Sequence, residues 1–183
     1  LIEGLTGKKI AIMNADNMYV KEMMRWAQND NNNVWTYTRE EKIQESYIKQ
    51  CFLIAQQRQS ESGISYVLSN ENKKVDVRSP IFGIHQVQNI TAAIAASTAC
   101  GMTLEDAARE ASQVSPVDRM MRPLKGVNGS TFIDDTFNNN PEGAIAALDF
   151  LNLSNGKKIL VFQPMIELGE YAKSAHERVG EYA

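Results

Sequence analysis

The strongest constraint on the fold is the stretch 129–148, in which a short apolar run, a polar turn and a helix follow one another. Residues 131–133 favour a strand, because β-branched and aromatic side chains suit a pleated sheet. Asn140 is a natural N-cap and Pro141 suits the first helical position, so we expect the helix to begin there. The intervening turn holds two aspartates and three asparagines. A strand, polar turn and helix in this order are typical of α/β proteins, which bind ligands at the carboxyl ends of their strands.

Composition places the chain among ordinary globular proteins. Of its 183 residues, 43% are hydrophobic and 22% are charged, and the net charge is -3. This balance gives no basic footprint for nucleic acid, and no apolar run approaches the roughly 18 residues of a membrane span. Cys51 and Cys100 lie in dissimilar surroundings, which favours reduced thiols in a cytoplasmic protein over a disulfide. We therefore expect a cytoplasmic protein without nucleic-acid partners. We also expect a monomer, although composition does not determine the oligomeric state.

The first half of the chain predicts a βαβ beginning followed by further strands. A short apolar run at 8–13, a polar turn at 14–17 and an amphipathic helix at 19–28 come first. Alternating, β-rich residues then predict strands at 34–38, 51–55, 64–68 and 75–79. Residues 56–63 are polar and are expected to form a mobile connection.

The second half predicts helices at 90–99, from Thr103 onward and at 171–182, with a strand at 157–162. His85 and Asn89 are four residues apart, so they share a face if the first of these helices starts early. Residues 116–126 contain two prolines and are expected to be a linker between domains. His176 is expected at the surface, without a chemical role.

Four segments resemble motifs of the ATP-dependent Mur ligases, in the family's order. Asp-Asp-Thr-Phe-Asn-Asn-Asn-Pro-Glu, at 134–142, is similar to D-D-[ST]-Y-N-A-N-P. Residues 14–17 are similar to N-A-D-[DN], and residues 83–95 to G-x-H-N-x-x-N-A-x-A-A-x-A. Residues 163–169 resemble G-D-M-x-E-L-G, with Gln-Pro in place of Gly-Asp.

The resemblance implies a fold and a domain division. Residues 1–122 would be the C-terminal part of a P-loop-type central ATP-binding domain, and 123–183 the start of a Rossmann-like C-terminal domain, both α/β. The chain starts at Leu1 without methionine, so we expect a piece of a longer protein. The phosphate loop, the Mg²⁺ ligands and the modified catalytic lysine would lie upstream. By itself the piece is expected to be inactive and to bind ATP weakly.

The reaction implied is ATP-dependent amide bond formation in peptidoglycan precursor synthesis. A peptide carboxylate takes the γ-phosphoryl group to give an acyl phosphate, which the incoming amine attacks. The motifs favour the branch that adds D-Ala-D-Ala to UDP-N-acetylmuramoyl-tripeptide. Positioning and charge neutralisation by Mg²⁺, lysine and arginine supply most of the catalysis in phosphoryl transfer.

The resemblance also implies a nucleotide site. Asp135 would hold the ribose or an arginine, across a hinge from the nucleotide. Either Arg122 or Arg119 would stabilise phosphate charge, and Arg122 is preferred because a proline holds the chain extended after it. His85 and Asn89 would border the adenine.

Two family positions carry a different residue here. Gln86 replaces an asparagine beside the adenine and keeps the amide on a longer arm. Phe137 replaces a tyrosine and loses its hydroxyl group. With Asn138 and Asn140, Phe137 would shape the side of the site that receives the incoming substrate.

Two alternatives remain open. One is a different Mur-type ligase, such as a folate-type or cyanophycin-type member, against which the N-A-N-P-like turn speaks. The other is a non-catalytic paralogue that keeps the fold as a binding module, towards which the replacements at Gln86 and Phe137 lean.

Overall fold

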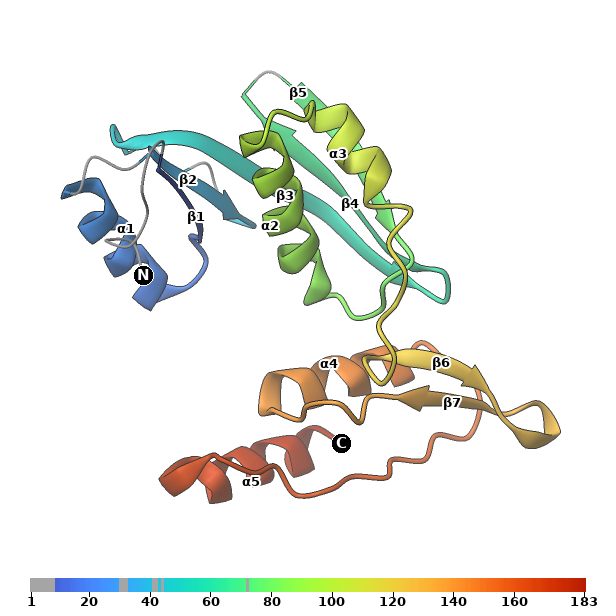
Figure 1. Cartoon of the computed structure of the whole chain (residues 1–183). Coiled ribbons are helices and arrows are strands. Elements are labelled where there is room, and N and C mark those ends of the chain that lie inside the picture. The colour runs from blue at the N-terminus through green and yellow to red at the C-terminus, as the bar shows by residue number, and fades with distance from the viewer. Residues whose placement is uncertain (1–8, 30–32, 41–42, 44, 72) are drawn as a thin grey trace. The chain divides into compact units, whose positions relative to one another are not determined.

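The computed structural model describes residues 9–29, 33–40, 43, 45–71 and 73–183, which form two compact units (Figure 1). Unit 1 contains the described parts of Leu1–Arg58, together with Ser65–Ser79 and Gln86–Val114. Unit 2 contains Gln59–Ile64, Pro80–His85 and Ser115–Ala183. His85 and the residues around Asp135 therefore belong to the same unit.

Five strands form the sheet of unit 1, in sequence order. The first three run parallel. The strands β3 and β4 are separated by Glu61 and Ser62 alone, a connection short enough for a hairpin. Their bounds are β1 Ile10–Asn14, β2 Asn33–Thr38, β3 Ile48–Ser60, β4 Gly63–Asn70 and β5 Lys73–Ser79.

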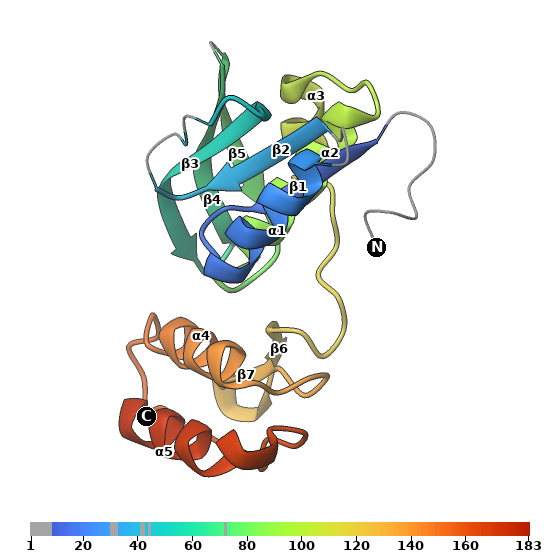
Figure 2. The same cartoon turned by 90° about the vertical axis from the view of Figure 1, so that its left-hand side faces the viewer.

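Three helices pack on this sheet: α1 (Met18–Asn29), α2 (Gln86–Ala99) and α3 (Leu104–Glu110). α1 contacts β1 and β2 (Figure 2), and α2 contacts the same strands and α3. The Asn17 side chain accepts hydrogen bonds from two backbone N–H groups at the start of α1, and the Thr103 side chain caps α3. The strands and helices expected before residue 111 are thus confirmed within the described residues; Lys8, part of the strand expected at 8–13, lies outside them.

The core between α1 and the sheet consists of small and flexible side chains. Met24 and Ala27 of α1 are buried against Ala11, Met13, Ala15 and Val34. A second buried contact joins α2 to the sheet. The Thr91 hydroxyl donates to the Tyr66 hydroxyl at 2.9 Å, and Thr91 is 0% exposed. Within the part of the chain that the structure describes, no helix is long and apolar enough to cross a membrane.

Unit 2 is built around an antiparallel ribbon of β6 (Arg122–Lys125) and β7 (Thr131–Asp134), joined through η1 (Val127–Gly129). The helices α4 (Pro141–Leu151), η2 (Gly169–Tyr171) and α5 (Ala172–Tyr182) follow. The expected N-cap is confirmed, since Asn140 Oδ1 accepts from the Gly143 N–H at 2.8 Å. β6 lies inside the segment expected to be a linker, so that expectation was wrong for its last residues: their backbone pairs with β7.

A small core joins α4 to α5 and to the segment before α2. Ala144, Leu148, Met165 and Val179 form one buried cluster. The ring centroids of Phe82 and Phe150 lie 5.3 Å apart, which fixes Pro80–His85 on α4 within unit 2.

Two further predictions, both of secondary structure, were wrong. Residues 157–162 form no strand, and Ile159, Leu160, Val161 and Phe162 are 37–86% exposed. Apolar character alone does not make a strand, because a strand needs a neighbour for its backbone hydrogen bonds, and no described strand pairs with this segment. Conversely, residues 56–60 are not a loop: they continue β3, pair with β4, and point alternate polar side chains to solvent.

His176 is half-buried rather than a plain surface residue, which corrects the expectation. Its Nε2 accepts from the Met165 N–H at 2.9 Å, so Nδ1 carries the proton and donates to the Ala172 carbonyl at 2.6 Å. The neutral imidazole therefore holds the backbone of Met165, a core residue that is 4% exposed.

Replacing His176 by phenylalanine should destabilise the protein. The ring volume is kept, but the buried Met165 N–H loses its acceptor, which costs about 1–3 kcal/mol. Urea denaturation measures the loss. Ser174→Ala, on the exposed side of α5, is the control and should change the free energy of unfolding by less than about 0.5 kcal/mol; equal effects of the two substitutions would contradict the role of His176.

Candidate functional site

The polar turn after β7, residues 134–137, is tied to the segment before β6. We call it the Asp135 turn. Asp135 Oδ1 accepts from the Met121 N–H at 3.0 Å, and the Arg119 carbonyl accepts from the Phe137 N–H at 3.0 Å. Two chain segments that are distant in sequence are thus held together at the carboxyl end of a strand.

The Arg119 guanidinium lies on this turn. Its Nε donates to Thr136 Oγ1 at 3.1 Å, and its Nη2 donates to the Thr136 carbonyl at 2.9 Å. The Thr136 hydroxyl in turn donates to Asp134 Oδ1 at 2.7 Å. Arg119 is exposed, so its charge is presented to solvent from a fixed position beside Asp135.

The backbone carrying Arg119 is strained. Arg119 has φ 65° and Met121 has φ 52°, the left-handed region that costs a non-glycine residue about 1–2 kcal/mol. Such conformations persist where surrounding contacts over-determine them, and here the contacts are those of the Asp135 turn.

Arg122, the other candidate arginine, lies elsewhere. It is the first residue of β6 and pairs with Asp134 of β7, and its guanidinium forms an ion pair with Asp118. No hydrogen bond or ion pair among the described residues joins Arg122 to Thr136. The structure therefore brings the side chain of Arg119, rather than that of Arg122, onto the Asp135 turn.

His85 is half-buried and interacts electrostatically with Asp135. Burial lowers the pKa of the His85 imidazole, and attraction to the Asp135 carboxylate offsets only part of this effect. Burial also raises the pKa of the Asp135 carboxyl, against the opposing effects of the Met121 N–H and of His85. Gly83 makes room for the ring: its φ is +93°, and a Cβ there would lie 2.6 Å from His85 Cε1.

Gln86 and Asn89 form an amide pair in the first turn of α2. The Asn89 Nδ2 donates to Gln86 Oε1 at 2.8 Å. Because α2 begins at Gln86, His85 precedes the helix, and the expectation that His85 and Asn89 share a helical face does not apply. Adjacent amides offer both donors and acceptors, as the edge of an adenine requires.

The three residues predicted to face the incoming substrate have different settings. Asn140 caps α4. Phe137 is 64% exposed and Asn138 is also exposed. Between them, Asn139 Nδ2 donates to the Gln163 carbonyl at 3.2 Å, which joins the turn to the segment that follows α4. Phe137 and Asn138 are thus solvent-accessible, whereas the Asn140 oxygen is occupied by its helix.

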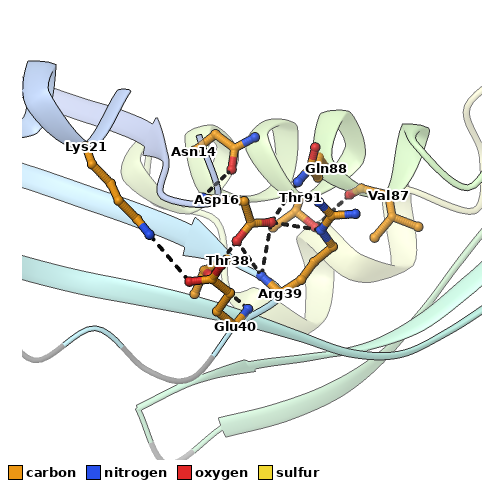
Figure 3. Close-up of polar contacts among 9 residues, drawn as sticks. All are labelled: Asn14, Asp16, Lys21, Thr38, Arg39, Glu40, Val87, Gln88 and Thr91. Carbon is orange, nitrogen blue, oxygen red and sulfur yellow. Dashed lines mark hydrogen bonds and ion pairs between the residues drawn. The ribbon is translucent and has the colours of Figure 1, made fainter. Parts of the chain in front are cut away.

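A polar cluster around Asp16 was not identified as functional from the sequence (Figure 3). Asp16 follows β1, and its carboxylate is 8% exposed. Oδ1 accepts from Thr38 Oγ1 at 2.6 Å and from the Arg39 N–H at 3.0 Å. Oδ2 accepts from Arg39 Nε and from Gln88 Nε2, both at 2.8 Å. The Asp16 cluster, defined by these four residues, joins the ends of β1 and β2 to the first turn of α2.

Burial raises the pKa of Asp16, but the hydrogen bonds from Thr38, Arg39 and Gln88 outweigh it, so the pKa lies below its ordinary value. Asp16 is therefore held ionised. The signal available in the sequence was its place directly after the first parallel strand, where α/β sheets gather polar groups. Within the described residues there is no cluster of three or more His, Cys, Asp or Glu side chains that could hold a metal ion.

Gly83→Ala should displace the His85 ring. The new methyl group cannot occupy the space of the imidazole, and the positive φ adds a backbone cost of about 1–2 kcal/mol. The chain has two histidines, so NMR of the Cε1–H signals separates them: we expect the His85 signal to move and the His176 signal to stay. Gly156→Ala is the control, because nothing lies within 4 Å of a Cβ there.

Asp135→Asn should lower the pKa of His85 further. Asparagine keeps an oxygen for the Met121 N–H but removes the charge that favours the imidazolium. NMR titration of the His85 Cε1–H measures this, with Asp149→Asn on α4 as control; a midpoint that rises would contradict the electrostatic pairing. The pKa of His85 is lower in the folded protein than in the unfolded chain. The stability that His85 contributes is therefore present above about pH 6.5, and it is lost as the pH falls through the pKa that His85 has in the folded protein.

Comparison with protein families finds one match. Residues 1–97 match the family described as Mur ligase middle domain. The chain is 27% identical over 182 residues to the UDP-N-acetylmuramoyl-tripeptide--D-alanyl-D-alanine ligase of Haemophilus influenzae, and 28% identical over 184 residues to that of Escherichia coli. Each alignment covers 100% of this chain but 37% and 39% of the relative, so the chain spans little more than a third of their length.

Solved structures share the fold. A crystal structure of MurF from Acinetobacter baumannii superimposes with a TM-score of 0.85 at 24% identity, over 100% of this chain and 38% of that one. MurF ligase from Thermotoga maritima, in complex with ADP, gives a TM-score of 0.73 at 20% identity, over 97% of this chain and 38% of that one. The α/β fold and the matched middle domain agree, and this chain belongs to the Mur ligase family.

Proposed function

We propose that this chain is part of an ATP-dependent ligase of peptidoglycan precursor synthesis, which joins D-Ala-D-Ala to UDP-N-acetylmuramoyl-tripeptide. The observation that carries the proposal is the alignment of the whole chain with two ligases of that name. The ADP bound to a MurF of the same fold supports a nucleotide as co-substrate. Residues 1–122 would belong to the central domain and residues 123–183 to the C-terminal domain.

In this proposal Arg119 is the arginine that stabilises phosphate charge. Its guanidinium is fixed on Thr136, beside Asp135, whereas Arg122 is paired with Asp118. A fixed, exposed guanidinium needs little reorganisation when negative charge develops, which is the source of electrostatic catalysis. Asp135 would hold the ribose or orient this arginine.

The adenine would lie against the amide pair of Gln86 and Asn89, bordered by His85. The lowered pKa keeps the His85 imidazole neutral at physiological pH, so it can both donate and accept hydrogen bonds. Phe137 and Asn138 are exposed and would face the incoming dipeptide, with Asn140 ordering the helix behind them.

The proposed reaction has two steps. An oxygen of the tripeptide carboxylate attacks the γ-phosphorus of ATP, forming an acyl phosphate and releasing ADP. The amine of D-Ala-D-Ala then attacks the acyl carbon, loses a proton and expels phosphate. When bound, Mg²⁺ would neutralise phosphate charge. Among the described residues no group of three or more His, Cys, Asp or Glu side chains could hold a metal ion, and none of these residues is assigned to it.

A second candidate function is a non-catalytic binding module. It is favoured by Phe137, which is 64% exposed and lacks the hydroxyl group of the family's tyrosine. A different Mur-type ligase is the other alternative.

A reconstituted reaction tests the proposal. A full-length protein carrying this chain is supplied with ATP, UDP-N-acetylmuramoyl-tripeptide and D-Ala-D-Ala, and the amide product is detected by mass spectrometry. Phosphate release that requires all three supports the proposal; no product under any substrate combination supports the module.

Arg119→Ala in the full-length ligase should lower kcat by about 10²- to 10³-fold, the effect of losing one fixed donor to a charged transition state. Arg122→Ala should change kcat less than about threefold, because the Arg122 guanidinium is paired with Asp118 and not with Thr136. Steady-state kinetics measures both, and a larger loss from Arg122→Ala would reverse the assignment. Arg119→Gly is the matched control for folding: it removes the same charge but tolerates φ 65°, so it should lose activity while keeping or gaining stability.

A further inference from the structure

The Asp16 cluster joins the end of the parallel strands to the helix turn that carries the amide pair. Gln88, which lies between Gln86 and Asn89 in the sequence, is in the first turn of α2. Its side chain reaches Asp16 (Figure 3). Thr38 and Arg39 reach the same carboxylate from the end of β2. One buried side chain therefore receives donors from two separate elements.

Helix geometry places Gln88 behind the amide pair. Gln86 and Asn89 share a face of α2, since they are hydrogen-bonded to each other at 2.8 Å. Residues two apart on a helix point about 200° apart, so Gln88 faces away from Gln86. The bond from Gln88 to Asp16 thus holds the turn from its rear without occupying the face that presents the amides.

Asp16 is suited to this role by its own surroundings. Its carboxylate is 8% exposed and accepts from four groups, so it is locked in one rotamer. The Arg39 side chain, half exposed, balances its charge. A buried carboxylate that lost its negative charge would leave these donors short of acceptors, which is costly in a buried site.

We propose that Asp16 is a positioning residue for nucleotide binding: through Gln88 it fixes the direction of the Gln86–Asn89 amide pair and thereby the recognition of adenine. This inference rests on the proposed function, because it takes the amide pair as the adenine edge. Asp16 itself does not touch the nucleotide. Its effect belongs to the affinity and base selectivity for ATP, and not to the transfer step.

The experiment is steady-state kinetics of the full-length ligase with three variants. Asp16→Asn should raise KM for ATP about tenfold, with kcat and KM for D-Ala-D-Ala within about twofold of wild type. The ratio of kcat/KM for ATP over GTP should fall in the same variant. Gln88→Leu should act in the same direction while leaving the Thr38 and Arg39 bonds intact. The double variant Asp16→Asn/Gln88→Glu exchanges the two groups, so that the amide introduced at position 16 donates to the carboxylate introduced at position 88. It should restore much of the lost affinity.

Glu71→Gln is the control, since it alters a different side-chain hydrogen bond of unit 1, that from Gln50 to Glu71, and should leave both KM and selectivity unchanged. A lower Tm for Asp16→Asn with unchanged KM and ATP/GTP selectivity would show a structural role only and overturn the inference. If Asp16→Asn fails to fold, Gln88→Leu decides by the same two readouts. An inactive wild-type ligase would instead reject the proposed function, so the two failures are distinguishable.

Discussion

The architecture of the candidate site depends on the hydrogen bonds between the Asp135 turn and the segment of Arg119 and Met121. Both of these residues have positive φ, although neither is glycine. An isolated chain would relax such a conformation, at a gain of about 1–2 kcal/mol for each residue. Here the carboxylate of Asp135 holds the Met121 N–H, and the Phe137 N–H holds the Arg119 carbonyl. The strain is therefore maintained by the turn itself, and it is what aims the Arg119 side chain at Thr136.

Features that depend on residues close together in the sequence could be predicted, whereas features that depend on distant partners could not. Local signals were sufficient for α4, because Asn140 and Pro141 act on the helix that they begin. They failed at residues 157–162, where strand formation depends on a partner elsewhere, and at residues 56–60, where pairing with β4 keeps a polar segment in β3. His176 was missed for the same reason: its partner, Met165, is set by the packing of α5 on α4.

The site shows the same division. The motifs supplied two candidate arginines, of which Arg122 was preferred for the proline that follows it, but loop length cannot be converted into a contact with the turn. The bonds of Arg119 to Thr136 exist because residues before β6 and after β7 are brought together by the ribbon. The Asp16 cluster likewise depends on Gln88, which lies 72 residues away in the chain. No local pattern predicts a hydrogen bond at that separation.

Asp16 and Asp135 differ in how far the hydrogen-bonding capacity of their carboxylates is already used. A carboxylate has about four lone-pair positions for donors. Those of Asp16 are taken up by Thr38, Arg39 and Gln88, which keeps its pKa low and its role internal. Asp135, in contrast, accepts one hydrogen bond from the described residues, that of Met121, and burial keeps its pKa raised. A carboxylate that is desolvated yet incompletely bonded gains most from an added donor. This supports the proposed role of Asp135 as an acceptor for a ribose hydroxyl, whereas Asp16 would act only through the groups that it already holds.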